Sequence, residues 1–226
     1  MSQTMRIDFV SDISCPWCVI GLSALEKAIV NIQNTANTAL EFEVYLQPFE
    51  LNPNMPVGGQ DTTEHLTQKY GSTPEQQSQI RENIRLRGAE LGFEFRPQGR
   101  DRIYNTFNAH RLLHWATLEG QPGQAVALKK ALFSAYFTNG QSPEDFTVLV
   151  QAAQSVGLDA QRAAQVLEDN EYAQEVREHA NLFIRSGIQS VPAIIINQKH
   201  LISGGQPVDV FERVLLEIGA QAKDQA

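Results

Sequence analysis

The chain of 226 residues has only two cysteines, Cys15 and Cys18, which lie three positions apart. This scarcity excludes a secreted disulfide scaffold, which spreads its cysteines along the sequence to close long loops, and a zinc ribbon, which needs a second cysteine pair. A disulfide across so short a ring removes almost no freedom from the unfolded chain, so it would stabilise little. The pair therefore indicates a bond whose value lies in being made and broken.

The sequence also lacks long apolar runs and an excess of positive charge. No segment approaches the roughly 20 apolar residues of a membrane helix, so we expect no membrane partner. Residues 1–12 show no basic stretch followed by an apolar run, which favours a cytoplasmic location over secretion. Nucleic acid is an unsuitable partner, because its binding depends on Lys and Arg, and this chain has 18 of them against 26 Asp and Glu, a net charge of -8.

Residues 1–58 predict a strand, a helix and a second strand. Apolar and polar residues alternate before the cysteine pair and again over residues 40–46, and apolar residues recur at helical spacing in between. Pro16 is tolerated only in the first turn of that helix, where its missing N–H would be unpaired anyway, so Cys15 is expected at the helix N-terminus. The long crossover predicts that the two strands are parallel.

Residues 59–186 predict helices. The clearest start is Thr73, which forms a capping box with Gln76 around Pro74, and its helix is expected to run to about Leu91. Further helices are predicted over residues 105–119 and 124–137, from Ser142-Pro143 to Gly157, after Asp159, and from Glu171 to Ser186.

Residues 187–226 predict a strand pair and a final helix. The run from Ala193 to Ile196 is typical of a buried strand, residues 200–203 can pair back as a hairpin, and Pro207 opens an amphipathic helix. The three segments together predict an α/β protein with a thioredoxin fold. Its central mixed sheet, flanked by helices, is interrupted at residues 59–186 by a large all-helical insertion subdomain.

The two cysteines are expected to differ. Cys15 would face the partial positive charge and free N–H groups of the helix start, which lower a thiol pKa from about 8.5 into the range of roughly 3.5–7.5. Cys18 continues the apolar stripe of the helix and should be shielded. We therefore predict that Cys15 attacks and that Cys18 resolves the mixed disulfide. Asp8 and Asp12 could influence these thiols, but solvation at the strand end is the favoured interpretation for both.

A zinc half-site is the competing interpretation of the pair. Cys-x-x-Cys pairs can bind zinc, but a structural site needs four ligands. His110 and His114 lie four positions apart on a predicted helix and could complete such a site, although neither is near the cysteines in sequence. A strand before the pair and a helix after it favour redox chemistry, so we predict no metal site and no separate cofactor.

The segments Cys15-Pro16-Trp17-Cys18 and Ser190-Val191-Pro192 resemble the DsbA family of thioredoxin-fold oxidoreductases, and its FrnE-like branch most closely. The resemblance implies that Pro192 is a cis proline facing the disulfide, with Val191 offering its backbone N–H and C=O to a bound peptide or thiol. Further matches to this branch cover essentially the whole chain: Ser11-Asp12, Ile20-Gly21, residues 105–111 (Asn-Thr-Phe-Asn-Ala-His-Arg) and residues 203–207 (Ser-Gly-Gly-Gln-Pro).

Trp17 stands between the cysteines at the helix start and is expected to contact the substrate. Pro16, Asn108 and His110 are weaker candidates for lining a substrate pocket. Asn108 and His110 fall on different faces of one helix, and a histidine among apolar neighbours usually packs. Because Trp17 offers only a neutral N–H to the thiolate, we expect a less oxidising couple than that of DsbA.

These residues predict a thiol–disulfide oxidoreductase that acts on protein or peptide disulfides and dithiols, or on glutathione as a co-substrate. Two alternatives stay open. A more distant resemblance to kappa-class glutathione transferases and 2-hydroxychromene-2-carboxylate isomerases implies a glutathione-dependent reaction, although those relatives carry serine in place of Cys15 and an acidic residue in place of Gln206. The other alternative is a non-catalytic metal-binding or interaction module. The sequence specifies neither the substrate nor the oligomeric state.

Overall fold

The computed structural model describes residues 3–35 and 40–223 and contains a four-stranded mixed sheet with the strand order β2-β1-β5-β6. The strand β1 (Gln3–Ser11) pairs in parallel with β2 (Leu40–Pro48) and antiparallel with β5 (Ala193–Ile196), which continues into the hairpin strand β6 (His200–Ser203). The predicted parallel pair and hairpin are therefore confirmed. Strands from opposite ends of the sequence meet at β1.

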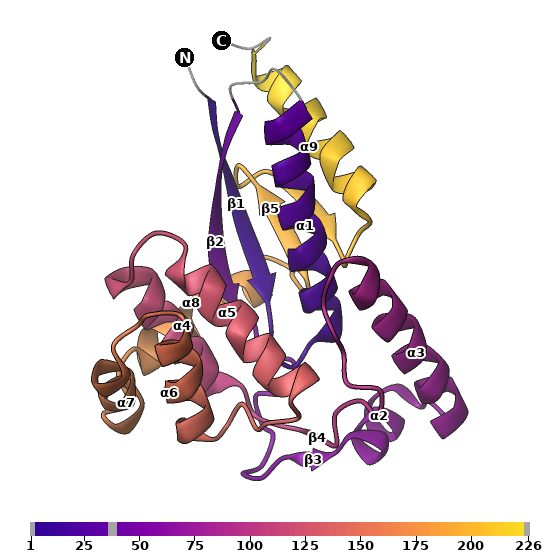
Figure 1. Ribbon diagram of the computed structural model, residues 1–226, viewed down its shortest axis with the longest axis vertical. Helices are drawn as coiled ribbons and strands as arrows, with labels where there is room; N and C mark the ends of the chain where they lie inside the picture. Colours follow the sequence, from indigo (N-terminus) through magenta and orange to yellow (C-terminus); the bar gives the residue numbers. More distant parts are fainter. Residues whose placement is uncertain (1–2, 36–39, 224–226) are drawn as a thin grey trace.

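The sheet is covered on both faces. The helices α1 (Pro16–Thr35) and α9 (Val208–Lys223) lie side by side along one face (Figure 1). Apolar side chains explain this: Met5, Ile7 and Phe9 of β1 belong to the same buried cluster as the inward residues of both helices. On the other face, Val10 packs in a smaller cluster that includes Phe183, which lies in the helix before β5. Burial on both faces accounts for the continuous apolar run of β5.

The chain between β2 and β5 forms most of the helices, which lie on either side of the lower part of α1 (Figure 1). They are α2 (Thr62–Tyr70), α3 (Pro74–Glu90), α4 (Phe107–Glu119), α5 (Gln124–Phe133), α6 (Phe146–Ser155), α7 (Ala160–Glu168) and α8 (Ala173–Arg185). The segment is not all-helical, because β3 (Gln60–Asp61) pairs with β4 (Arg102–Ile103). Two-residue strands carry no alternating pattern that a sequence could show. The division of the chain at residues 59–186 stays a prediction.

Local capping decides where these helices begin. The predicted capping box is present, because Thr73 Oγ1 accepts from the Gln76 N–H and the Gln76 side chain accepts from the Thr73 N–H. The predicted start at Ser142-Pro143 is wrong. Ser142 accepts a local bond from Glu144 N–H in a turn, and the helix starts only after Asp145, whose carboxylate accepts from the Thr147 N–H.

Two further boundaries differ from the prediction. The helix expected over residues 124–137 leaves α geometry at Phe133 and ends in a π-helical turn over Ser134–Thr138. The helix expected from Glu171 begins at Ala173, after Tyr172 in a left-handed conformation with φ 59°. Within the described ranges, no helix is both long and apolar enough to span a membrane.

Candidate active site

The two cysteines lie where β1 gives way to α1. A turn follows Ser11, and the Cys15 N–H donates to the Asp12 carbonyl across 3.2 Å, which places Cys15 directly before the first helical residue, Pro16. The Cys18 N–H donates to the Cys15 carbonyl across 3.1 Å. Both thiols are unoxidised, with Cys15 4 % exposed and Cys18 0 % exposed. The shielding of Cys18 predicted from the apolar stripe is confirmed.

The loop before β5 closes over Cys15. The Val191–Pro192 peptide bond is cis, and the Cys15 thiol lies 3.5 Å from the Val191 carbonyl oxygen, to which its S–H donates. Close contact between this loop and α1 requires a glycine in the helix, because a Cβ at Gly21 would lie 2.9 Å from Pro192 Cγ. The structure thus brings Val191 and Pro192 to the first cysteine, from the far end of the chain.

The electrostatic environment separates the two thiols. A hydrogen bond from the Cys18 thiol, its backbone N–H and the charge of Arg100 lower the pKa of Cys15, against the opposing effects of burial and of Asp12. Burial, together with the neighbouring Cys15, raises the pKa of Cys18 well above its ordinary value. The direction predicted for Cys15 is confirmed. The main cause is the hydrogen bond from Cys18 rather than the helix end alone.

Asp12 is a buried carboxylate, which corrects the expectation of strand-end solvation. It is 0 % exposed, and its oxygens accept from the Ser14 N–H (3.0 Å), the Ser14 hydroxyl (3.0 Å), the Leu51 N–H (2.6 Å) and the Thr106 hydroxyl (2.7 Å). Burial alone would raise its pKa, but His110 and the backbone N–H groups hold the pKa of Asp12 at about 2. The carboxylate therefore stays charged beneath the motif.

Asp8 is also buried, so the solvation expected for it is wrong as well. It lies 4 % exposed on β1, where Arg6 and Gln47 donate to its oxygens across 2.7–2.9 Å. Because the long side chains of Arg6 on β1 and Gln47 on β2 reach its oxygens, this carboxylate can be buried and still keep its hydrogen bonds.

Of the two helix α4 candidates, only His110 approaches the motif. Its Nε2 lies 3.6 Å from Asp12 Oδ1 and has no hydrogen-bond partner among residues 3–35 and 40–223, so the expected role as a satisfied packing residue does not hold. Asn108 instead accepts from the Arg111 guanidinium at 2.9 and 3.2 Å. The two residues do lie on different faces, as the helical spacing predicts. Together with Pro16, they are absent from the lining of both cavities described below.

Two cations near the thiols were missed by sequence reasoning. An Arg100 N–H donates to the Ser14 carbonyl next to Cys15, and the guanidinium carbon lies 5.6 Å from the Phe137 ring centre. Lys129 of α5 is 1 % exposed, and its charge acts on Cys18, Asp12 and Cys15. Nothing near Arg100 in sequence indicates this role. Lys129, however, interrupts the apolar face of its helix, and that signal was available.

Replacing Lys129 with methionine is expected to stabilise the protein by about 3 kcal/mol at neutral pH. Burial lowers the pKa of Lys129 from 10.5 to about 8, so folding costs free energy whenever the lysine is charged in the unfolded chain. The gain should be complete below about pH 8 and vanish as the pH rises through 10.5. The same substitution should raise the pKa of Cys18, because the cation favours its thiolate. Urea unfolding and thiolate absorbance measure the two effects.

Lys130→Met is the matched control. Lys130 is largely exposed and pairs with Glu26 across 2.9 Å, a surface contact that contributes less than about 1 kcal/mol. It should leave the pKa of Cys18 unchanged. Equal titration of Cys18 in both variants would contradict the role assigned to the buried lysine.

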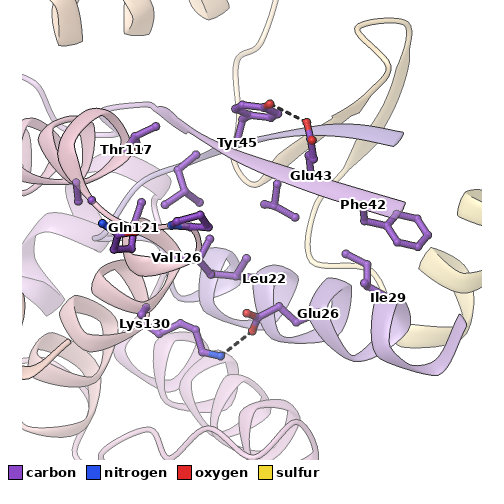
Figure 2. Close-up of a pocket in the computed structure, with 18 of the residues that line it drawn as sticks. Leu22, Glu26, Ile29, Phe42, Glu43, Tyr45, Thr117, Gln121, Val126 and Lys130 are labelled. Carbon is purple, nitrogen blue, oxygen red and sulfur yellow. Dashed lines mark hydrogen bonds and ion pairs between the residues drawn. The ribbon is translucent and has the colours of Figure 1, made fainter. Parts of the chain in front are cut away.

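One cavity lies away from the thiols. It has a volume of about 980 Å³ and lies between α1, β2 and the α4–α5 connection, with Leu22, Phe42 and Val126 among its apolar lining (Figure 2). Its rim carries the Lys130–Glu26 ion pair. None of residues 15–18 or 191–192 lines it, so it is not assigned to disulfide exchange. A second cavity, of about 880 Å³, includes both Trp17 and Val191 in its lining.

The described residues contain no cluster of ligands that would support the metal-site alternative. Across residues 3–35 and 40–223, no group of three or more His, Cys, Asp and Glu side chains is arranged to hold a metal ion. His114 instead lies against Tyr172 and His179, with its ring centre 5.3 Å from that of Tyr172 and 5.4 Å from that of His179.

Comparison with known proteins places this geometry in a family. The model of the DSBA-like thioredoxin domain matches residues 6–216. The chain belongs to the DSBA-like thioredoxin domain family. In this family the redox group is a cysteine pair of the protein itself rather than a cofactor. With Cys15 and Cys18 in place, the protein is a thiol–disulfide oxidoreductase of this family.

The chain is similar to several individual proteins. The chain is 34 % identical to the probable DsbA oxidoreductase SCO1869 from Streptomyces coelicolor, with a TM-score of 0.83 over 94 % of this chain and 89 % of that one. It is 29 % identical to the uncharacterized protein YwbO of Bacillus subtilis (strain 168) over 94 % of this chain and 96 % of YwbO. A 2-hydroxychromene-2-carboxylate isomerase, 14 % identical, shares the fold with a TM-score of 0.68 over 98 % of this chain and 99 % of the isomerase.

Proposed function

We propose that Cys15 is the attacking thiol and Cys18 the resolving thiol of this DSBA-like oxidoreductase. The observation that carries the proposal is the opposite shift of the two pKa values, lowered for Cys15 and raised for Cys18. The Cys15 thiolate attacks one sulfur of a substrate disulfide, forms a mixed disulfide and expels the first substrate thiolate. Cys18 then loses its proton and attacks Cys15 Sγ, which expels the second substrate thiolate. The protein is oxidised by two electrons, and the substrate is reduced by two.

The proposed substrate contacts are Val191, Pro192 and Trp17. The Val191 carbonyl already accepts from the Cys15 thiol, so it lies beside any group that joins Cys15 in a mixed disulfide. Trp17 and Val191 line one cavity, which supports a single binding surface on both sides of the reacting sulfur. Protein or peptide disulfides and small thiols such as glutathione are the substrate classes that fit this chemistry.

The direction we propose is reduction. Neither Pro16 nor Trp17, the two residues between the cysteines, brings a cation or a strong donor to the thiolate, and the cation that acts on Cys15 is Arg100. The couple should therefore be less oxidising than that of DsbA. Membership of the FrnE-like branch, supported by the segments at residues 105–111 and 203–207, and a cytoplasmic location belong to the same proposal.

A redox titration tests the proposal. The purified protein is equilibrated in graded glutathione buffers, quenched with acid and alkylated, and the modified cysteines are counted by mass. We expect one two-electron transition between zero and two free thiols, at a potential more negative than about -120 mV. The transition should disappear in Cys15→Ala. Two thiols that stay reduced in every buffer would contradict disulfide exchange, and a potential near that of DsbA would contradict the reducing direction.

The glutathione-dependent isomerase alternative has no support beyond the shared fold. Relatives of that kind are expected to carry serine where this chain has Cys15, and the hydroxyl would activate bound glutathione rather than attack a disulfide. Full activity of Cys15→Ser toward an electrophile in the presence of glutathione would favour it.

A further inference from the structure

The cavity next to the redox pair contains a cation whose role is not explained by the exchange reaction. It lies between α1, α3 and residues 204–208, and Arg87 of α3 is part of its lining. One Arg87 N–H donates to the Gly205 carbonyl across 3.1 Å, and the guanidinium carbon lies 5.2 Å from the centre of the Trp17 ring. These two contacts orient the guanidinium beside the residue that separates the cysteines.

Arg87 has no acidic partner among the described residues. In the part of the chain that the structure describes, no carboxylate oxygen lies within 4.0 Å of its nitrogens, and one of its five N–H donors is engaged. Arg85, two residues earlier on the same helix, instead donates both Nε and Nη2 to Glu82 at 2.8 and 2.7 Å. A half-buried guanidinium with free donors is suited to a carboxylate, which it binds through two parallel hydrogen bonds.

The local charge also differs from that of the whole chain. The cavity lining contains Arg87 and Lys27 against the single carboxylate of Glu90. The chain as a whole carries a net charge of -8, which repels anions. An anionic substrate would therefore be attracted to this cavity despite the negative charge of the chain as a whole.

We propose that this cavity selects disulfides that carry a carboxylate near the reacting sulfur, and that Arg87 is the residue that binds the carboxylate. The inference rests on the proposed exchange reaction and adds the substrate class to it. During the first step Cys15 bonds to one substrate sulfur, and the half that stays attached would enter the cavity that Val191, Trp17 and Arg87 line. The thiolate that leaves takes the electron pair of the broken S–S bond, so no further reactant is needed.

Three small disulfides of different charge test the proposal. Reduced protein is mixed with anionic dithiodipropionate, neutral hydroxyethyl disulfide or cationic cystamine, and the single-turnover rate of oxidation is measured at low and high salt. In the wild type, lowering the salt concentration should raise the oxidation rate with the anionic compound relative to the rate with the neutral one. Arg87→Gln should reduce the rate with the anionic compound about fivefold relative to the neutral one. Arg85→Gln, the matched control, should leave this ratio unchanged.

Each other result has a definite meaning. An equal loss with all three compounds in Arg87→Gln would overturn the proposal, because it would show that Arg87 only supports Trp17. An unchanged anionic-to-neutral ratio would overturn it as well. Arg87→Lys keeps the charge and should recover part of the anionic preference, and no recovery would count against carboxylate binding. Absence of exchange with every compound in the wild type would instead contradict the proposed function itself.

Discussion

Replacing Cys15 with serine is expected to abolish disulfide exchange, whereas replacing Cys18 with serine should stop the reaction halfway. Cys15 supplies the nucleophile for the first step, and a hydroxyl at this position has no comparable reactivity, so the rate should fall at least about a thousandfold. Without Cys18 the first step still proceeds, but nothing attacks Cys15 Sγ afterwards. The mixed disulfide should then accumulate.

Intact-mass measurement after an acid quench distinguishes the two variants. Cys18→Ser should gain the mass of one substrate half, with one equivalent of substrate thiol released, and Cys15→Ser should gain none. Cys18→Ala, unlike Cys18→Ser, leaves no side-chain donor for the hydrogen bond that lowers the pKa of Cys15, so its adduct should form more slowly below neutral pH than that of Cys18→Ser. An adduct that forms on Cys18 in the absence of Cys15, at the wild-type rate, would reverse the assigned roles.

Replacing Asp12 with asparagine is expected to destabilise the fold and, at the same time, to make Cys15 more acidic. Asparagine offers one acceptor oxygen where the carboxylate offers two, and its amide hydrogens would face the donors that Asp12 now satisfies, among them the Leu51 N–H. A loss of about 3 kcal/mol in the free energy of unfolding follows from leaving buried donors unpaired. Urea unfolding of the reduced protein measures it.

The same substitution should make the Cys15 thiol more acidic. The negative charge of Asp12 raises the pKa of Cys15, so its removal should lower that pKa and speed alkylation of Cys15 at mildly acidic pH. Asp8→Asn is the control, because Asp8 is a buried carboxylate on β1, the strand that precedes Asp12, and its partners are Arg6 and Gln47. An unchanged pKa of Cys15 in Asp12→Asn would show that the carboxylate does not act on the thiol.

The stability of the protein in acid provides a second test of the Asp12 carboxylate. The pKa of Asp12 in the folded protein, about 2, lies below its ordinary value of 3.8. Its contribution, about 2 kcal/mol, is therefore fully present above about pH 4 and is lost as the pH falls toward 2. The Asp12→Asn variant should lack this part of the acid dependence.

Local patterns were sufficient to predict the elements around the motif. The alternation of apolar and polar residues predicted β2, and the run of four apolar residues predicted β5. Thr73 with Gln76 predicted the start of α3. In each case the decisive interactions lie within a few residues. The failure at Ser142 has the same origin, because two residues capable of capping lie close together and only the packing of the helix decides between Ser142 and Asp145.

The chemistry beneath the motif could be predicted only in part. The roles expected of Cys15 and Cys18 follow from neighbours in sequence, but the burial of Asp12 depends on Leu51, Thr106 and His110, which belong to separate segments. No pattern close to Asp12 distinguishes it from a solvated residue at a strand end. Arg87 and Arg100 likewise reach the motif only through tertiary packing.

The strand order β2-β1-β5-β6 has a consequence during synthesis of the protein. Cys15 and the Val191 carbonyl that accepts its thiol are 176 residues apart, and β1 has no neighbour on its β5 side until the last part of the chain is made. At translation rates of about 5–20 residues per second, that interval lasts roughly 10–35 s. For this time the nascent chain carries two thiols that the finished fold shields, so a ribosome-bound chain presents both cysteines to cellular oxidants before either is protected.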